Sequence, residues 1–459
     1  MLPRATLLAL LVSLAFCTPP AAQPGPVTTE ERAEVADRIG TLLAERYVFA
    51  DKGVEAGAYV RERIEAGAYD GVTEPDSFAA VLTRDLQHVT RDKHLRVRHR
   101  APQQGPGGPP DPLRERLSQR ERNRAANLGI QSVEILDGNV GYLDLRFFPP
   151  EEDVREAYDA ALRLLANVDA LIIDERQHGG GSPSGIRYLT SYFFDAPTHL
   201  NSLHWREGDT ENVEEFWTHT DIGGTPRPDL PLFVLTSDYT FSGAEEFANN
   251  LKELGRATIV GETTGGGANP GGLMPAGQRF GVFVPVGRAV NPISGTNWEG
   301  VGVAPDVEVP AEDALDRALE LARPAATAYD AAREQRLETQ ITVLETGMAD
   351  AAAAFDAGRD ASAQVATLLR TTLDTGLMDE PTINGYGYLH LQSERPALAV
   401  AIFRFNVQTF PESWNVYDSL GEALAAQGET DEAKRMYEKA RALAPNDQHG
   451  RIDDMLERL

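Results

Sequence analysis

The 459-residue chain has a single cysteine, Cys17, close to its N-terminus. One cysteine excludes an intrachain disulfide, a cysteine-ligated zinc site and a catalytic thiol in the folded part of the chain. Lysine is scarce as well, because most of the basic residues are arginines. The lysines are Lys52, Lys93, Lys252, Lys434 and Lys439. Any mechanism that needs a lysine base therefore has few candidates.

Positive charge is also in the minority. There are 70 Asp and Glu residues against 43 Lys and Arg, which gives a formal net charge of −27 at pH 7. Such an excess argues against nucleic acid or an anionic membrane surface as a partner. We interpret it as a solvated acidic surface. The length allows two or three domains, and a hydrophobic fraction of 42% is typical of globular proteins.

The N-terminus lacks an apolar run long enough to span a bilayer. Arg4 precedes the apolar run 5–16, and CTPPAAQPGP follows it, which is the pattern of a secretory signal peptide. We predict a signal peptide over residues 1–22 and export to the bacterial periplasm or cell envelope. Residues 14–17 resemble a lipobox, so a lipid anchor at Cys17 and cleavage after Ala22 are both open.

Helical and strand patterns then follow each other along the chain. Three amphipathic helical patterns predict an N-terminal helical domain over 27–98, and the Pro- and Gly-rich segment 101–119 indicates a loop too short to hold a folded module. Strand and helix patterns alternate over 99–310, with a hairpin at 137–139 and an apolar strand at 170–174. This alternation predicts an α/β core.

The last part of the chain has helical patterns without strands. We predict a helical linker over 311–379 and two tetratricopeptide-like (TPR-like) repeats over 380–459. The repeats follow from a 34-residue period that relates Gly387 to Gly421, Ala399 to Ala433, Phe403 to Tyr437 and Pro411 to Pro445. They are expected either to bind a protein partner or to cap the preceding helices.

Ser242 stands where the apolar strand pattern 233–235 passes into a helical pattern. The free amides and positive dipole at a helix N-terminus favour an oxyanion, so this position suits a nucleophile. The sequence Ser242-Gly243-Ala244-Glu245 is also a capping box, in which the hydroxyl has a purely structural role. Glycine clusters at 179–181 and 265–267 each follow an apolar strand and lack the spacing of a phosphate or dinucleotide loop.

Three blocks, DALIIDERQHGGGSP, TSDYTFSGAEEFANNLKELGRATIVGETTGGG and WEGVGVAPDVEV, resemble peptidase family S41. That family includes the tail-specific (carboxyl-terminal processing) proteases, the tricorn core and the interphotoreceptor retinoid-binding protein modules. The resemblance implies a crotonase/ClpP-like core with Ser242 as nucleophile. It also implies oxyanion donors from Gly179, Gly180 and the amide of Gly243.

The resemblance also bears on the base. Processing proteases have a lysine where this chain has Gly267, and the segment 101–119 has no room for their PDZ module. A tricorn-like arrangement would use His94 as base and Glu299 to orient it, and either residue has a plain surface role as its alternative. Lys93 is the fallback base. His178 replaces an asparagine usual in the family and is a second base, a substrate contact or a tolerated side chain.

These observations predict an exported serine peptidase that cleaves peptide or protein substrates through an acyl-enzyme on Ser242. Two alternatives are a non-catalytic module that binds small apolar ligands, as in the retinoid-binding relatives, and a TPR scaffold. No acidic cluster has convincing metal-ligand spacing, so we expect neither a metal nor a cofactor. A histidine base should give activity that rises with pH near 7.

Overall fold

The computed structural model describes residues 25–100 and 111–459. The predicted signal peptide, with Cys17 and Ala22, lies outside the described residues. The chain divides into two compact units, Met1–Thr327 and Ala328–Leu459. In the described ranges, no helix is both long and apolar enough to cross a membrane.

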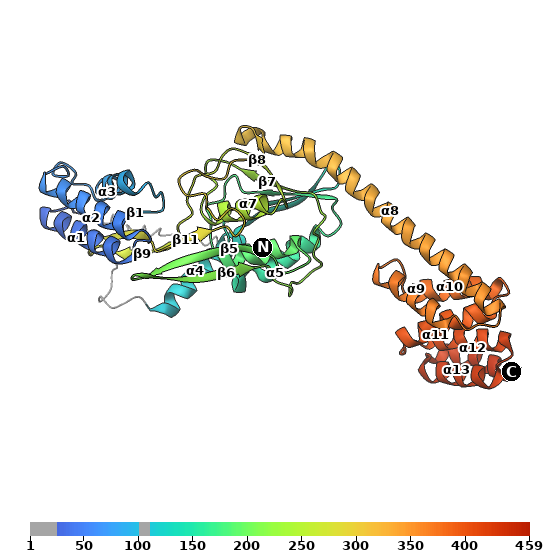
Figure 1. The fold of residues 1–459 in the computed structure, drawn as a ribbon. Coiled ribbons are helices and arrows are strands. Elements are labelled where there is room, and N and C mark those ends of the chain that lie inside the picture. The colour runs from blue at the N-terminus through green and yellow to red at the C-terminus, as the bar shows by residue number, and fades with distance from the viewer. Residues whose placement is uncertain (1–24, 101–110) are drawn as a thin grey trace, which may run out of the picture. The chain divides into compact units, whose positions relative to one another are not determined.

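Three helices begin the first unit: α1 (Thr29–Arg46), α2 (Ala50–Glu65) and α3 (Pro75–Thr90). Apolar residues one helical turn apart, such as Val35, Ile39 and Leu43 in α1, place one face of each helix in a common core. Strand β10 (Phe280–Pro285) completes that core with Phe280, Val282 and Val284. Strand β1 (Arg96–His99) pairs antiparallel with β10, which in turn pairs with β9 (Gly271–Pro275). In Figure 1 the helices therefore lie beside strands from much later in the sequence.

The central sheet has six strands in the order β12-β8-β7-β4-β3-β2. They are β2 (Ile130–Leu136), β3 (Val140–Leu145), β4 (Ala170–Asp174), β7 (Leu232–Thr236), β8 (Thr258–Gly261) and β12 (Val307–Glu308). All neighbours are parallel except β2 and β3, which form the predicted hairpin. Helices α5 (Glu151–Leu164), α6 (Pro183–Thr190) and α7 (Gly243–Glu253) connect these strands. The predicted mixed α/β class is confirmed.

A second sheet of three strands, β11-β5-β6, joins β5 (His199–Glu207), β6 (Thr210–Trp217) and β11 (Gly287–Val290). One local prediction was wrong. Part of the segment expected to be a loop forms helix α4 (Pro112–Ala125), because Asp111 caps its first turn by accepting a hydrogen bond from the amide of Leu113 at 3.0 Å. Proline at the first helical position suits this start.

The long helix α8 (Ala314–Asp356) begins in the first unit, where Ala314, Ala318, Ala322 and Ala326 pack on the central sheet. The second unit is helical throughout its described elements. It continues with α9 (Ser362–Asp374), α10 (Glu380–Gln392), α11 (Pro396–Thr409), α12 (Trp414–Gln427), α13 (Thr430–Leu443) and α14 (His449–Arg458).

Two helical pairs, α10 with α11 and α12 with α13, repeat one packing relationship. The Cα of Gly387 faces the ring of Phe403, and 34 positions later Gly421 faces Tyr437. A small residue opposite an aromatic ring at the same spacing explains the sequence period. The TPR-like name and the predicted domain limits remain predictions, and β1 spans the predicted limit between 98 and 99.

Candidate active site

Three loops meet at the carboxyl edge of the central sheet. The glycine loop 179–181 follows β4, Ser242 follows β7, and the glycine loop 265–267 follows β8. Because β7 lies between β4 and β8, Ser242 is flanked by both glycine loops. The carboxyl edge of parallel strands is where α/β folds place their sites.

Ser242 has an unusual backbone conformation, with φ 60° and ψ −119°. A non-glycine residue in this region costs about 1–3 kcal/mol, and such strain is concentrated at functional sites. Gly180 allows the close approach that this geometry needs, since a Cβ there would lie 2.8 Å from the Cβ of Ser242. Ser242 and Glu245 also have the arrangement of a capping box at the start of α7. The structural and functional interpretations of Ser242 are thus compatible.

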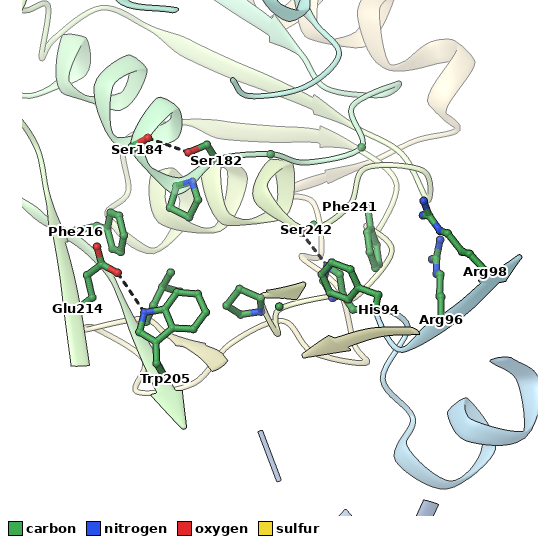
Figure 2. A pocket seen from close by; sticks show the side chains of 17 residues that line it. His94, Arg96, Arg98, Ser182, Ser184, Trp205, Glu214, Phe216, Phe241 and Ser242 are labelled. Atoms are coloured by element: carbon green, nitrogen blue, oxygen red, sulfur yellow. Dashed lines mark hydrogen bonds between the residues drawn. The ribbon is translucent and has the colours of Figure 1, made fainter. Parts of the chain in front are cut away.

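The Nε2 atom of His94 lies 2.9 Å from the Oγ atom of Ser242. His94 belongs to the turn between α3 and β1, so the N-terminal helical domain positions it at the edge of the central sheet. Its ring packs close to Phe241, with centroids 4.6 Å apart, and to Phe283, at 5.8 Å. Figure 2 shows this serine–histidine contact on the wall of a cleft of about 670 Å³. A base within hydrogen-bond reach of a serine is the geometry required for nucleophile activation.

The surroundings of Gly267 leave no space for a lysine side chain at this position. A Cβ at residue 267 would lie 2.7 Å from Cε1 of His94 and 2.3 Å from the Phe241 ring. His94 therefore occupies the space that a side chain at 267 would need. Lys93, the fallback base, instead donates a hydrogen bond to the carbonyl of Gly265 at 2.6 Å.

Two carboxyl groups lie close to the imidazole. One potential ligand atom each from Asp92, His94 and Glu299 lie within 4.8 Å of one another. Asp92 accepts hydrogen bonds from the Tyr47 hydroxyl, the Asn269 amide and the backbone amide of His94. Glu299 accepts one from the backbone amide of Ala268 at 2.6 Å. The structure therefore brings Ser242, His94 and Glu299 together, and it adds Asp92, which sequence reasoning treated only as part of the histidine motif.

This cluster is a poor metal site. Its buried atoms without a hydrogen-bond partner in the described part of the chain are Nδ1 of His94 and Oε1 of Glu299. Two available atoms are fewer than the three protein ligands of a catalytic zinc site. Both carboxylate oxygens of Asp92 already accept hydrogen bonds. The arrangement fits orientation of the imidazole better than binding of a cation.

Burial changes the titration of these groups. Burial and the nearby Arg96 guanidinium lower the pKa of His94 to about 4. Burial and the adjacent Asp92 carboxylate raise the pKa of Glu299 to about 8. Burial also raises the pKa of Asp92. His94 is thus a neutral imidazole at pH 7, as a general base must be, and the rise of activity is expected at a lower pH than the sequence alone suggested.

Glu245 organises the backbone around the serine. Its buried carboxylate accepts hydrogen bonds from the amides of Ser242, Gly266 and Gly267 and from the hydroxyl of Thr264, at 2.8, 2.6, 2.8 and 2.5 Å. Sequence reasoning assigned Glu245 only to the capping box. Its reach to the loop after β8 depends on tertiary structure, and no local pattern indicates it.

The predicted oxyanion donors differ in their availability. The amide of Gly179 donates to the carbonyl of Arg146 at 3.1 Å, and the amide of Gly180 donates to Nδ1 of His178 at 3.0 Å. Gly243 donates no hydrogen bond to a described residue. A Cβ on Gly243 would lie 2.8 Å from the amide nitrogen of Gly181. Among the described residues, the amides of Gly181 and Gly243, rather than those of Gly179 and Gly180, are the neighbouring pair without a hydrogen-bond acceptor.

His178 is fully buried beside the glycine loop 179–181. Its Nδ1 accepts the Gly180 amide, so the ring is neutral with its proton on Nε2. Burial and the Arg146 guanidinium lower its pKa to about 3. Its ring centroid lies 4.3 Å from that of Phe148. These contacts give His178 a structural role in the glycine loop, beyond the second base, substrate contact or tolerated side chain expected from the sequence.

Two models of known protein domains match the sequence of this chain. Residues 139–309 match the sequence model of peptidase family S41, and residues 28–125 match the N-terminal domain of peptidase S41 in eukaryotic IRBP. The chain contains an S41 peptidase domain. The match over 139–309 includes the three sequence blocks and confirms their family resemblance. The region before that domain matches the N-terminal domain named for the retinoid-binding relative.

Two curated relatives carry the same domain. The carboxy-terminal processing protease CtpB of Bacillus subtilis (strain 168) is 25% identical over 178 residues, which are 38% of this chain and 35% of that protein. A carboxyl-terminal-processing protease of Picosynechococcus sp. is 27% identical over 173 residues, covering 38% of this chain and 40% of that protein. The chain thus spans little more than a third of the length of these relatives.

Solved structures with similar folds include mature CPAF, with 13% identity, a TM-score of 0.44 and coverage of 66% of this chain and 96% of that chain. The photosystem II D1 C-terminal processing protease has 16% identity and a TM-score of 0.39, with coverage of 62% and 94%. The tricorn protease has 14% identity and a TM-score of 0.42, with coverage of 65% and 37%. The family assignment rests on the sequence matches.

Proposed function

We propose that this protein is a serine peptidase that cleaves peptide bonds through an acyl-enzyme on Ser242, with His94 as general base. The observation that carries the proposal is the 2.9 Å contact between Nε2 of His94 and Oγ of Ser242, made in an S41 domain. His94 accepts the hydroxyl proton as Oγ attacks the substrate carbonyl. The imidazolium then protonates the leaving amine, and water releases the acyl group by the reverse proton path.

Glu299 and Asp92 are the orienting groups in this proposal. Carboxyl groups close to the imidazole stabilise the imidazolium that forms during the reaction. The amides of Gly181 and Gly243 are placed to bind the oxyanion, and one such donor is typically worth about 3 kcal/mol of barrier. Gly267 supports histidine rather than lysine as base, because His94 fills the space beside it.

Covalent labelling by a fluorophosphonate tests the proposal directly. The wild-type protein should be labelled at Ser242, and both Ser242→Ala and His94→Ala should abolish labelling. Loss with Ser242→Ala alone would transfer the role of base to Lys93. A folded wild type that is not labelled would contradict the hydrolase and favour the alternative, a module that binds apolar ligands.

Export and a partner for the C-terminal helices are further proposals. Arg4 and the apolar run 5–16 support export, and cell fractionation with Cys17→Ser would separate a lipid anchor from a free protein. The equivalent packing of Gly387 and Gly421 supports a TPR-like pair of repeats, a class of surface that binds peptides or proteins.

A further inference from the structure

The cleft that contains Ser242 has an uneven distribution of charge. The charged side chains of its lining are Arg96 and Arg98 at one end and Glu214 at the other. Glu214 accepts a hydrogen bond from the indole nitrogen of Trp205 at 3.2 Å. Figure 2 shows Ser242 between these two ends, with both guanidinium groups beyond Phe241. A substrate lying across the serine would therefore have a cationic wall on one side.

Strand β1 fixes the direction of both arginines. Alternate residues of a strand share a face, so Arg96 and Arg98 project together while Val97 between them is buried in the core of the N-terminal helices. Arg96 lies opposite Phe283 of β10, another residue of the cleft. Strand pairing thus presents the two guanidinium groups to the cleft as a pair.

Neither guanidinium forms a salt bridge with another described residue. Arg96 donates through Nε to the carbonyl of Lys93 at 2.7 Å, and its Cζ lies 5.4 Å from the centroid of the Phe241 ring. These contacts hold the side chain and leave its terminal nitrogens available. Neither Arg96 nor Arg98 has a salt-bridge partner in residues 25–100 and 111–459, although acidic residues outnumber basic ones in the chain by 70 to 43. An arginine pair on a solvated strand would be unremarkable, but this pair lines the cleft beside the candidate nucleophile.

We propose that Arg96 and Arg98 bind a carboxylate of the substrate next to the bond held at Ser242. This inference rests on the proposed peptidase function for the identity of the ligand as a peptide. The guanidinium fork matches a carboxylate in charge and in geometry, and two parallel N–H···O bonds add orientation to attraction. The carboxylate is either the C-terminus of the peptide or an acidic side chain.

Peptide binding to the full chain with Ser242→Ala tests the proposal without turnover. Fluorescein-labelled penta-alanine is used as the free acid, as the C-terminal amide, and as the amide with one glutamate at each position in turn. At least one carboxylate peptide should bind about fivefold to tenfold more tightly than the plain amide, as measured by fluorescence anisotropy. The advantage should shrink at high salt. The free acid and the glutamate peptides distinguish the two sources of the carboxylate.

Variants assign the effect to the arginine pair. Arg98→Gln should remove most of the advantage, and Arg98→Glu should reverse it in favour of a lysine-containing amide. Arg98 is the sharper test, because Arg96 also acts on the pKa of His94. Arg100→Gln is the matched control, since Arg100 follows β1 directly and does not line the cleft.

Equal binding of all the peptides, or of none, would overturn the proposal, as would an advantage that survives Arg96→Gln combined with Arg98→Gln. Fluorophosphonate labelling of the wild type reports separately on the nucleophile. A labelled protein without carboxylate preference refutes the arginine site alone. An unlabelled protein that retains the preference refutes the peptidase and leaves the carboxylate site in place.

Discussion

The Nδ1 atom of His178 accepts a hydrogen bond from the backbone amide of Gly180 at 3.0 Å. This contact requires a neutral ring, and burial keeps the pKa of His178 at about 3. In the unfolded chain a histidine has a pKa of about 6.5. Between these values the unfolded state binds more protons than the folded state, so the free energy of unfolding rises with pH.

We therefore predict that His178→Phe weakens the pH dependence of stability. The variant should be less stable at pH 7, because the Gly180 amide loses its acceptor. Between pH 6.5 and 5 the wild type should lose about 2 kcal/mol that the variant does not lose. Urea denaturation at both pH values measures the difference. Parallel losses in the two proteins would show that His178 is protonated in the folded state.

The pH dependence of labelling should report on His94. With a pKa of about 4, the base is already neutral well below pH 7, so the fluorophosphonate labelling rate should rise with an inflection near 4. Arg96→Gln removes a positive neighbour and should move the inflection to higher pH, whereas Arg100→Gln should not. Identical profiles for the wild type and Arg96→Gln would contradict His94 as the titrating base.

Glu299 should add a second inflection to the pH dependence of the labelling rate. Its carboxyl has a pKa of about 8, so it gains its charge in the range where it can stabilise the His94 imidazolium. The labelling rate of the wild type should rise again near pH 8, and that of Glu299→Gln should not. Above pH 9 the two should differ by roughly tenfold to a hundredfold. Identical profiles would exclude an electrostatic role for Glu299.

Glu245→Gln tests the backbone network under the serine. The four groups that donate hydrogen bonds to the Glu245 carboxylate cannot all be satisfied by glutamine, because its NH₂ group would face backbone amides. We expect a loss of about 3 kcal/mol in the free energy of unfolding, together with slower labelling of Ser242. Glu253→Gln, at the other end of α7, should change stability by less than about 0.5 kcal/mol. Equal stability of the two variants would contradict the network.

Much of the fold follows from local patterns. Strand β4 was predicted over the residues that form it, because the four apolar residues 170–173 between turns have few alternatives. Helix α4 was missed since the Pro- and Gly-rich composition of the preceding residues dominated the window, although Asp111 and Pro112 are ordinary start signals. The sharing of one core by α1, α2, α3 and β10 involves residues more than 190 positions apart and leaves no local pattern.

The candidate site was also predictable only in part. Ser242, His94 and Glu299 were predicted from motif resemblance, and the contact across 148 residues brings the first two together. Which backbone amides of the glycine loop are free to donate a hydrogen bond was not predictable from the sequence. Whether Gly180 or Gly181 offers a free N–H depends on peptide orientation and on the His178 ring, which composition does not encode. The pKa of His94 likewise depends on burial by Phe241 and Phe283, which come from other segments.

Truncation should show which part of the chain carries the reaction. Deletion from Glu380 would uncover Leu344, Met348, Val365 and Leu369, because these side chains share a core with Ile383 and Leu398. That protein should aggregate. A chain ending at Thr327 keeps the alanines of α8 that pack on the central sheet, and it should stay monodisperse in size-exclusion chromatography and retain labelling of Ser242. Loss of labelling in a well-folded 1–327 protein would mean that the C-terminal helices contribute to the site itself, and the partner-binding proposal for them would have to be replaced.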